Sequence, residues 1–333
     1  MGKSKRLVFL GTGFLGGMLL LLWGMLLWAT SMPGQSLQGE LPALSVEQQA
    51  VRERLQQHVQ VLAADIGERH HNNMPALNRA ADYIQQQLRA LGYEPLIQQF
   101  GDKDYRNIVV EVPASGDSGE IIVIGAHYDS WLTPGADDNA SGVAVLLELA
   151  RAFAGQSLPR TLRFVAFPNE ERPFFGTEAM GSRVSAALAR ARGDRITAMF
   201  SLEMLGYYSS EAGSQHYPPV IDLRYPDTAN FIAFIANVGS ATVMRRAIAY
   251  FRGQSLFPAE GMAAPQWLVP DIRRSDNSAY WYYDYPAVMV TDTSNFRNPN
   301  YHSARDTVAT LDYDSMARVL TGLRGMFQAL ASE

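Results

Sequence analysis

The sequence predicts a single α/β domain, with a mostly parallel mixed sheet covered by helices on both faces, preceded by one transmembrane helix. Short runs rich in β-branched and aromatic residues alternate with amphipathic helical stretches, which is typical of such a sheet. A hydrophobic content of 47% over 333 residues is sufficient for a packed core. A long uncharged stretch close to the N-terminus predicts the transmembrane helix.

Residues 1–30 are expected to form a short cytoplasmic stub and a transmembrane anchor. Lys3, Lys5 and Arg6 precede the uncharged residues 7–29, which are long enough to cross a hydrocarbon core of roughly 30 Å. A cleaved signal peptide is the alternative, but its apolar region normally covers only about 7 to 15 residues. Because the basic residues lie before the span, the N-terminus is expected in the cytoplasm and the domain on the outer, periplasmic or extracellular side.

The rest of the chain is expected to form a flexible linker, residues 31–45, and the α/β domain, residues 46–333. The linker is rich in Pro, Gly and Ser. Helices are predicted over residues 45–65, 76–91, 141–154, 176–191 and 312–330. Strands are predicted over residues 107–112, 120–126, 161–167, 198–203 and 286–291. Residues 207–275 are less regular, with one helix expected near residues 227–238 and loops that shape a pocket; no charged residue there stands out as a specificity determinant.

Composition excludes several classes of function. The net charge of -5, with acidic and basic residues interspersed, gives no basic face for binding nucleic acid. The sequence has no cysteine, which excludes disulfides, thiolate nucleophiles and zinc–thiolate sites. Any metal must therefore be held by His, Asp and Glu.

Polar residues follow the predicted strands, at the positions where ligands bind in open α/β sheets. Each of these strand ends carries a potential metal ligand. They are His127, Glu170, Glu171, Glu203 and, in the loop after the last strand, His302.

His127 and Asp129 are two residues apart, so their side chains point to the same side of an extended chain. Asp129 is then placed to accept the second ring N–H of His127, which fixes the tautomer of a metal-binding imidazole. For this pair alone, an ordinary polar strand end is the simpler interpretation.

The loop GADDNASG, residues 135–142, precedes a predicted helix. A carboxylate in this loop can bridge two cations because it has two oxygens, and Asp137 and Asp138 both satisfy this requirement on geometry alone. Capping of the following helix by Asp or Asn is the alternative.

Glu170 and Glu171 are adjacent and point to opposite sides if the chain is extended. One can then bind metal while the other acts as a general base on the attacking water. An isolated pair of this kind is usually solvated surface charge, but this pair follows a strand that looks buried.

These groups, in order along successive strand ends, predict a site for two metal ions. Two histidines and several carboxylates without a thiolate suit zinc, in sites where ions roughly 3.5 to 4 Å apart stabilise both oxygens of a displacement. Such a site lowers the pKa of water to about 7, which makes amide hydrolysis accessible.

The motifs resemble those of the M28 family of metallopeptidases, whose familiar members are zinc aminopeptidases. The resemblance extends from about residue 50 to the C-terminus, and includes NPNYHSARDT at residues 298–307 and SDN at residues 275–277. It implies that Asp138 bridges two zinc ions. His127 and Glu203 would complete the shell of one ion.

The same resemblance implies that Glu171 and His302 complete the shell of the second ion, and that Glu170 is the general base. Tyr301 matches a tyrosine that stabilises the oxyanion in some members; a packed loop aromatic is the alternative. Two positions depart from the family pattern: Glu203 stands where many members have Asp, and Asn277 stands where they have His.

The function expected from these observations is an aminopeptidase acting on peptides outside the cytoplasmic membrane. A carboxypeptidase-like or glutaminyl-cyclase-like relative is the first alternative, and a non-catalytic anchored binding module is the second. The remaining histidines are not expected to bind metal: His58 on a helix surface, His70 and His71 in a polar turn, and His216 in a loop.

Overall fold

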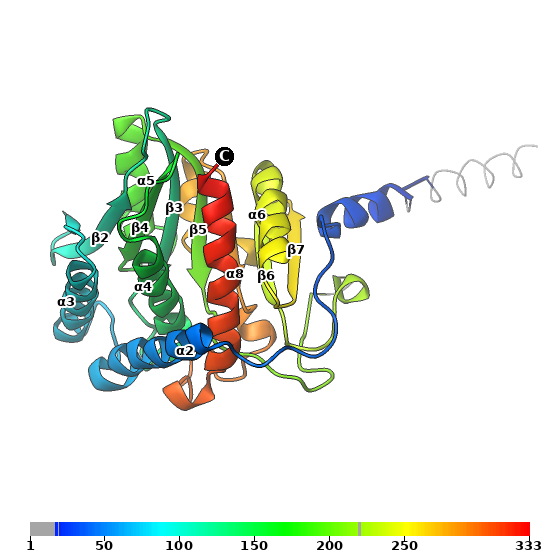
Figure 1. The fold of residues 1–333 in the computed structure, drawn as a ribbon, viewed down its shortest axis with the longest axis horizontal. Coiled ribbons are helices and arrows are strands. Elements are labelled where there is room, and N and C mark those ends of the chain that lie inside the picture. The colour runs from blue at the N-terminus through cyan, green and yellow to red at the C-terminus, as the bar shows by residue number, and fades with distance from the viewer. Residues whose placement is uncertain (1–16, 19, 219–220) are drawn as a thin grey trace, which may run out of the picture.

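The structure is a computed structural model that describes residues 17, 18, 20–218 and 221–333. Its eight strands form one mixed sheet in the order β1-β2-β4-β3-β5-β8-β6-β7 (Figure 1). The strands are β1 (Leu96–Phe100), β2 (Tyr105–Val112), β3 (Glu120–His127), β4 (Thr161–Phe167), β5 (Arg195–Glu203), β6 (Ile232–Asn237), β7 (Ala259–Ala264) and β8 (Ala287–Thr291). The pairs β3/β4, β3/β5, β5/β8 and β6/β7 are parallel, and β1/β2, β2/β4 and β6/β8 are antiparallel. The predicted α/β domain with a mostly parallel mixed sheet is confirmed.

Helices cover both faces of the sheet. They are α2 (Val46–Val59), which continues as a π-helix over Gln60–Ile66, α3 (Met74–Ala90), α4 (Gly142–Phe153), α5 (Gly181–Arg192), α6 (Ala241–Gln254), α7 (Asn277–Tyr282) and α8 (Tyr313–Ala331). The larger core cluster lies on the face covered by α2, α3, α4, α6 and α8, and the smaller one lies under α5 and α7. Phe200 of β5 packs edge-on against Phe327 of α8, with ring centroids 5.1 Å apart, in the centre of the larger cluster.

The segment predicted as a linker contacts the edge strand β7 and the helix α6. Residues 31–45 form neither helix nor strand. The Arg252 guanidinium donates to the carbonyls of Pro33 and Gly34, at 3.0 and 3.1 Å, and the Ala259 N–H donates to Ser36 Oγ at 3.0 Å. Met32 packs beside Gly261. This part of the linker therefore runs along the last strand of the sheet.

The predicted membrane anchor falls partly on residues outside the described ones, because residues 1–16 and 19 are not described. Among the described residues, no helix combines the length and the apolar character needed to span a bilayer. The anchor and the orientation of the chain therefore stay predictions.

The helix expected near residues 227–238 is wrong, because residues Ile232–Asn237 form strand β6. Short apolar runs do not distinguish a buried strand from a buried helix by periodicity alone. Here Ile232, Phe234 and Ala236 pack into the core while β6 pairs with β7 on one side and β8 on the other. These neighbours, distant in sequence, decide the strand.

Candidate metal centre

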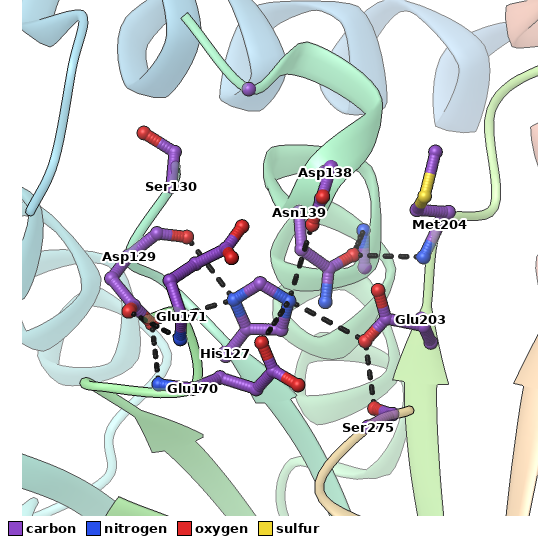
Figure 2. Close-up of polar contacts among 12 residues, drawn as sticks. His127, Asp129, Ser130, Asp138, Asn139, Glu170, Glu171, Glu203, Met204 and Ser275 are labelled. Carbon is purple, nitrogen blue, oxygen red and sulfur yellow. Dashed lines mark hydrogen bonds and ion pairs between the residues drawn. The ribbon is translucent and has the colours of Figure 1, made fainter. Parts of the chain in front are cut away.

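The predicted ligands converge at the carboxyl ends of β3, β4 and β5 (Figure 2). His127 ends β3 and Glu203 ends β5, while Glu170 and Glu171 follow β4 after two residues. Because β4, β3 and β5 are parallel neighbours, their ends bring these side chains to one edge of the sheet. Asp138 enters from the loop before α4, and His302 enters from the loop after β8.

The ligand atoms form two groups that share Asp138. The atoms of His127, Asp138 and Glu203 lie within 4.8 Å of one another, as do those of Asp138, Glu171 and His302. Asp138 offers one oxygen to each group. Its Oδ1 lies 3.3 Å from His127 Nε2, and its Oδ2 lies 3.1 Å from His302 Nε2. This is the geometry of a carboxylate that can bridge two cations.

Asp137 has other partners, so the geometry distinguishes the two aspartates that the sequence left open. Its Oδ1 accepts the Gly206 N–H at 2.9 Å, and its Oδ2 accepts the Asn298 side-chain amide at 2.6 Å. Asp137 therefore holds two loops together, and both of its oxygens have partners other than the imidazoles.

The donor set fits divalent cations. The Nε2 atom of His127 is buried and lacks a hydrogen-bond partner. It lies 3.3 and 3.4 Å from carboxylate oxygens of Asp138 and Glu203, so a cation between these atoms would satisfy all three groups. Nitrogen and carboxylate oxygen donors in buried positions suit zinc.

The pKa shifts of the site residues, in the protein without cations, also indicate a site for cations. Burial alone lowers the pKa of His127, but the carboxylates of Glu203 and Glu170 raise it well above its ordinary value. Burial, opposed by His127, raises the pKa of Glu170 well above its ordinary value. Burial and the charge of Asp138 raise the pKa of Glu171 to about 7. A cation in the cluster would favour the charged form of both glutamates, which burial opposes.

The two groups differ in exposure. The side chain of His127 is fully buried, whereas that of His302 is 33% exposed. A cleft of about 830 Å³ opens onto Asp138, Glu170, Glu171 and His302. A substrate can therefore reach the group that contains His302 most directly.

Asp129 supports the site through contacts that were not predicted, in addition to the predicted one with His127. Its carboxylate accepts the backbone N–H groups of Glu170 and Glu171, at 3.1 and 3.0 Å. The Nδ1 atom of His127 lies 3.1 Å from the main-chain oxygen of Asp129 and 3.4 Å from its Oδ1. Asp129 thus orients both glutamates, in addition to facing the imidazole as predicted (Figure 2).

Tyr301 lies in the wall of the cleft. Its ring stacks on His302, with centroids 3.8 Å apart. Its hydroxyl accepts a hydrogen bond from Arg274 Nη2 at 3.1 Å, and burial raises its pKa above the ordinary value. Both roles considered for this residue, oxyanion donor and packed aromatic, are compatible with this position.

Sequence reasoning missed residues that hold the site loops. Ser275 donates to Glu203 Oε2 at 2.7 Å, and Asp306 accepts the N–H groups of Asp137 and Asp138 at 2.8 and 3.1 Å. Both lie in the motifs at residues 275–277 and 298–307, which were the available signals. Arg69, which no pattern marks, is fully buried and donates to the carbonyls of Leu62, Gly67, Tyr128, Pro134 and Gly135.

The expectation that His58 lies on a helix surface is wrong. It is buried, with Nδ1 2.6 Å from the Tyr83 hydroxyl and Nε2 3.4 Å from Glu148, because this face of α2 packs on α4. His70 is buried beside His71 in the turn before α3, and His216 is exposed in its loop. Among the described residues, the two ligand groups include none of these four histidines.

Comparisons with known proteins show the family and the fold of the chain. The model of a family described as peptidase family M28 matches residues 107–326. YfbL of Escherichia coli (strain K12), described as an uncharacterized protein, is 39% identical over 293 residues, which cover 84% of this chain and 88% of YfbL. A probable leucine aminopeptidase of Trichophyton verrucosum (strain HKI 0517) is 26% identical over 226 residues, 63% of this chain. The match covers 53% of that enzyme, so this chain spans about half its length.

Among solved structures, BSAP, a zinc aminopeptidase from Bacillus subtilis, superposes with a TM-score of 0.67. The superposition covers 88% of this chain and 97% of BSAP, at 14% sequence identity. At this identity the likeness is one of fold alone.

Proposed function

Since the chain belongs to peptidase family M28, we propose that it is a zinc aminopeptidase with two metal ions, which removes N-terminal residues from peptides. The observation that carries the proposal is the position of Asp138, whose two oxygens each face a different imidazole. A carboxylate in this position can bind two adjacent cations at once. Members of the family act on peptides.

We propose that His127, Asp138 and Glu203 hold one ion and that Asp138, Glu171 and His302 hold the other. When bound, the ions supply Lewis acidity and lower the pKa of the attacking water. The residues of the chain orient the reactants. Asp129 fixes the backbone of both glutamates, and Ser275 fixes one oxygen of Glu203.

Glu170 is the proposed general base. It lines the cleft, and its raised pKa suits a group that must hold a proton during turnover. In the reaction, the water oxygen bonds to the amide carbon as Glu170 takes a proton from the water. The carbon–nitrogen bond then breaks, and Glu170 returns the proton to the leaving amine. Tyr301 is proposed to stabilise the oxyanion, with packing on His302 as the alternative.

The test compares the full chain with Glu170→Gln, and with Glu178→Gln as a matched control because Glu178 is exposed. Glu170→Gln should keep the wild-type metal content, measured by mass spectrometry, and lose about 10²- to 10⁴-fold in turnover. Glu178→Gln should behave as the wild type. A Glu170→Gln enzyme with full activity would contradict the proposed mechanism.

The choice of substrate separates the proposal from its alternatives. An aminopeptidase hydrolyses a free peptide and a C-blocked peptide, but not an N-blocked one. Hydrolysis of the free and N-blocked peptides, but not of the C-blocked one, would indicate a carboxypeptidase, and cyclisation of an N-terminal glutamine would indicate a glutaminyl cyclase. Full metal loading without turnover of any peptide would favour a binding module.

We also propose that residues 7–29 anchor the enzyme with its active site on the outer side of the cytoplasmic membrane. The basic residues before this uncharged stretch support the orientation. Fractionation of cells and digestion of intact spheroplasts with an added protease test it. Full-length protein in the soluble fraction, or protection from the protease, would contradict it.

A further inference from the structure

A second cavity, of about 110 Å³, lies beside the active-site cleft. The two share the side chains of Glu203, Asp271, Arg274 and Tyr301 in their walls. The second cavity therefore begins at a residue of the metal centre. It extends from there over strands β8, β6 and β7, whose residues line it.

The floor of this cavity is a row of residues across four strands. Glu203 of β5 pairs with Thr291 of β8, Thr291 with Ala233 of β6, and Ala233 with Glu260 of β7. Paired residues on neighbouring strands point to the same face of a sheet. All four line the cavity. At about 4.8 Å per strand, the Cα atoms of Glu203 and Glu260 are separated by roughly 14 Å.

Between these two acids the strands contribute Thr291 and otherwise apolar side chains. The next row of paired residues consists of Met289, Ile235 and Met262, which also line it. Loop residues such as Tyr225 and Ile272 form further parts of the wall. The cavity thus has a mainly apolar floor with the carboxylate of Glu260 on the last strand, and polar loop residues such as Gln215 and Asn295 also line it.

Ser36 and Arg252 both stabilise the charge of Glu260, but neither offsets its burial. The closest contact of the arginine, Arg252 Nη2 to Glu260 Oε2, is 3.3 Å long. The guanidinium makes shorter hydrogen bonds to the carbonyls of Ala259, Pro33 and Gly34. Burial raises the pKa of Glu260 despite this arginine. A second cation at the carboxylate would therefore be favourable.

We propose that this cavity binds the side chain of the substrate's N-terminal residue and that Glu260 selects lysine or arginine. The inference rests on the proposed aminopeptidase function. Lysine combines an apolar four-carbon stem with a compact charged tip, which matches a mainly apolar floor with an acid on its last strand. Leucine has no charge for Glu260 to bind.

The test compares lysyl and norleucyl p-nitroanilides, because norleucine has the stem of lysine without its charge. The wild type should have the higher kcat/KM for the lysyl substrate. In Glu260→Gln the ratio of the two kcat/KM values should fall by about 10- to 100-fold, the usual effect of losing a hydrogen bond to a charged group. Glu211→Gln, which removes an exposed loop acid, should keep the wild-type ratio.

A wild-type preference for norleucyl, leucyl or phenylalanyl substrates over lysyl would overturn the inference, as would an unchanged ratio in Glu260→Gln. Circular dichroism checks that the variant is folded. If it is not, Glu260→Asp, which withdraws the charge by one methylene, should lower the ratio in the same direction.

Binding separates a failure of this inference from a failure of the proposed function. Lysinamide and norleucinamide are titrated calorimetrically into Glu170→Gln, with and without Glu260→Gln. If no aminoacyl substrate is hydrolysed, the aminopeptidase proposal fails, yet tighter binding of lysinamide that depends on Glu260 still supports the cavity's role. Equal binding of the two amides overturns that role whether or not the enzyme hydrolyses peptides.

Discussion

The two halves of the sheet carry different parts of the site. At the ends of β3, β4 and β5, buried charged groups gather around Asp138. Over β6, β7 and β8, an apolar cavity is built from side chains along the strands. The charged half depends on short sequence motifs at strand ends, whereas the apolar half depends on which strands lie side by side. The charged residues therefore stand in short sequence motifs, whereas the shape of the cavity depends on pairing between strands that are distant in sequence.

The largest effect is expected from a mutation of Asp138, which the two groups of ligand atoms in the charged half share. Asp138→Asn keeps the side-chain size but removes the charge that faces both imidazoles. Loss of a single electrostatic group in an active site costs about 10²- to 10³-fold, and Asp138 is proposed to bind two ions, so we expect at least about 10³-fold lower kcat/KM. Metal content should fall from about two ions per chain.

Asp137→Asn is the matched control for this variant. Asp137 is buried next to Asp138 but bonds only to protein groups, and burial raises its pKa well above the ordinary value. Asp137→Asn keeps one of the two acceptor oxygens, so the free energy of unfolding should fall, whereas metal content should stay unchanged. Equal metal loss in the two variants would remove the distinction between the aspartates.

The apolar half should respond to mutation through stability. Phe234 of β6 is fully buried and packs edge-on against Phe251 of α6, with centroids 5.4 Å apart. Phe234→Ala should lower the free energy of unfolding by about 3 to 5 kcal/mol, measured by urea denaturation. Leu256→Ala, at a side chain 60% exposed, should change it by less than about 0.5 kcal/mol. Similar effects of the two variants would show that β6 is not part of the core.

A smaller effect is expected where a hydroxyl orients a ligand. Ser275→Ala removes the hydrogen bond to Glu203 Oε2. We expect metal affinity, measured by competition with a chelator, to fall by about 10- to 100-fold. Ser118→Ala changes a half-buried hydroxyl in the loop before β3, at the opposite end of the sheet, and should leave the affinity unchanged. Unaltered affinity in Ser275→Ala would mean that Glu203 needs no such support.

The smallest effect concerns a carboxylate outside both halves. Burial alone would raise the pKa of Glu148, but hydrogen bonds from His58 and two arginines lower it from 4.5 to about 2. Because the folded pKa is the lower one, Glu148 contributes stability above pH 4.5 that is lost as the pH falls towards 2. In metal-free protein, Glu148→Gln should flatten the decline of unfolding free energy in that range. An identical decline in both proteins would contradict this.

Sequence reasoning predicted the charged half well because its information is local. The five predicted strands are present, and His127, Glu170, Glu171 and Glu203 lie at the ends of β3, β4 and β5, where they were expected. The choice of Asp138 over Asp137 as the bridging ligand stays a prediction, which the geometry supports. The sequence does not show that Asp129 bonds to two backbone amides or that Arg69 binds carbonyls of Tyr128, Pro134 and Gly135, because these contacts join segments far apart. Burial of His58 likewise depends on the packing of α2 on α4.

The apolar half was the part that sequence reasoning described least well. Strands β6 and β7 and helix α6 were not predicted, since short apolar runs such as Ile232–Asn237 have no period that separates strand from helix. Glu260 did not stand out in the sequence either. Its place at the end of the cavity follows only from the register of β7 against β6.

The linker beside β7 bears on how the protein avoids aggregation. As the last strand of the sheet, β7 presents unpaired backbone groups, and such edges recruit strands from other molecules. Ser36 Oγ accepts the Ala259 N–H, and Arg252 binds the Ala259 carbonyl, so the first residue of this edge has no free backbone group. Met32 covers Gly261 further along. A chain that begins at residue 46 would expose this edge to self-association, even though it would keep every residue of the candidate metal centre.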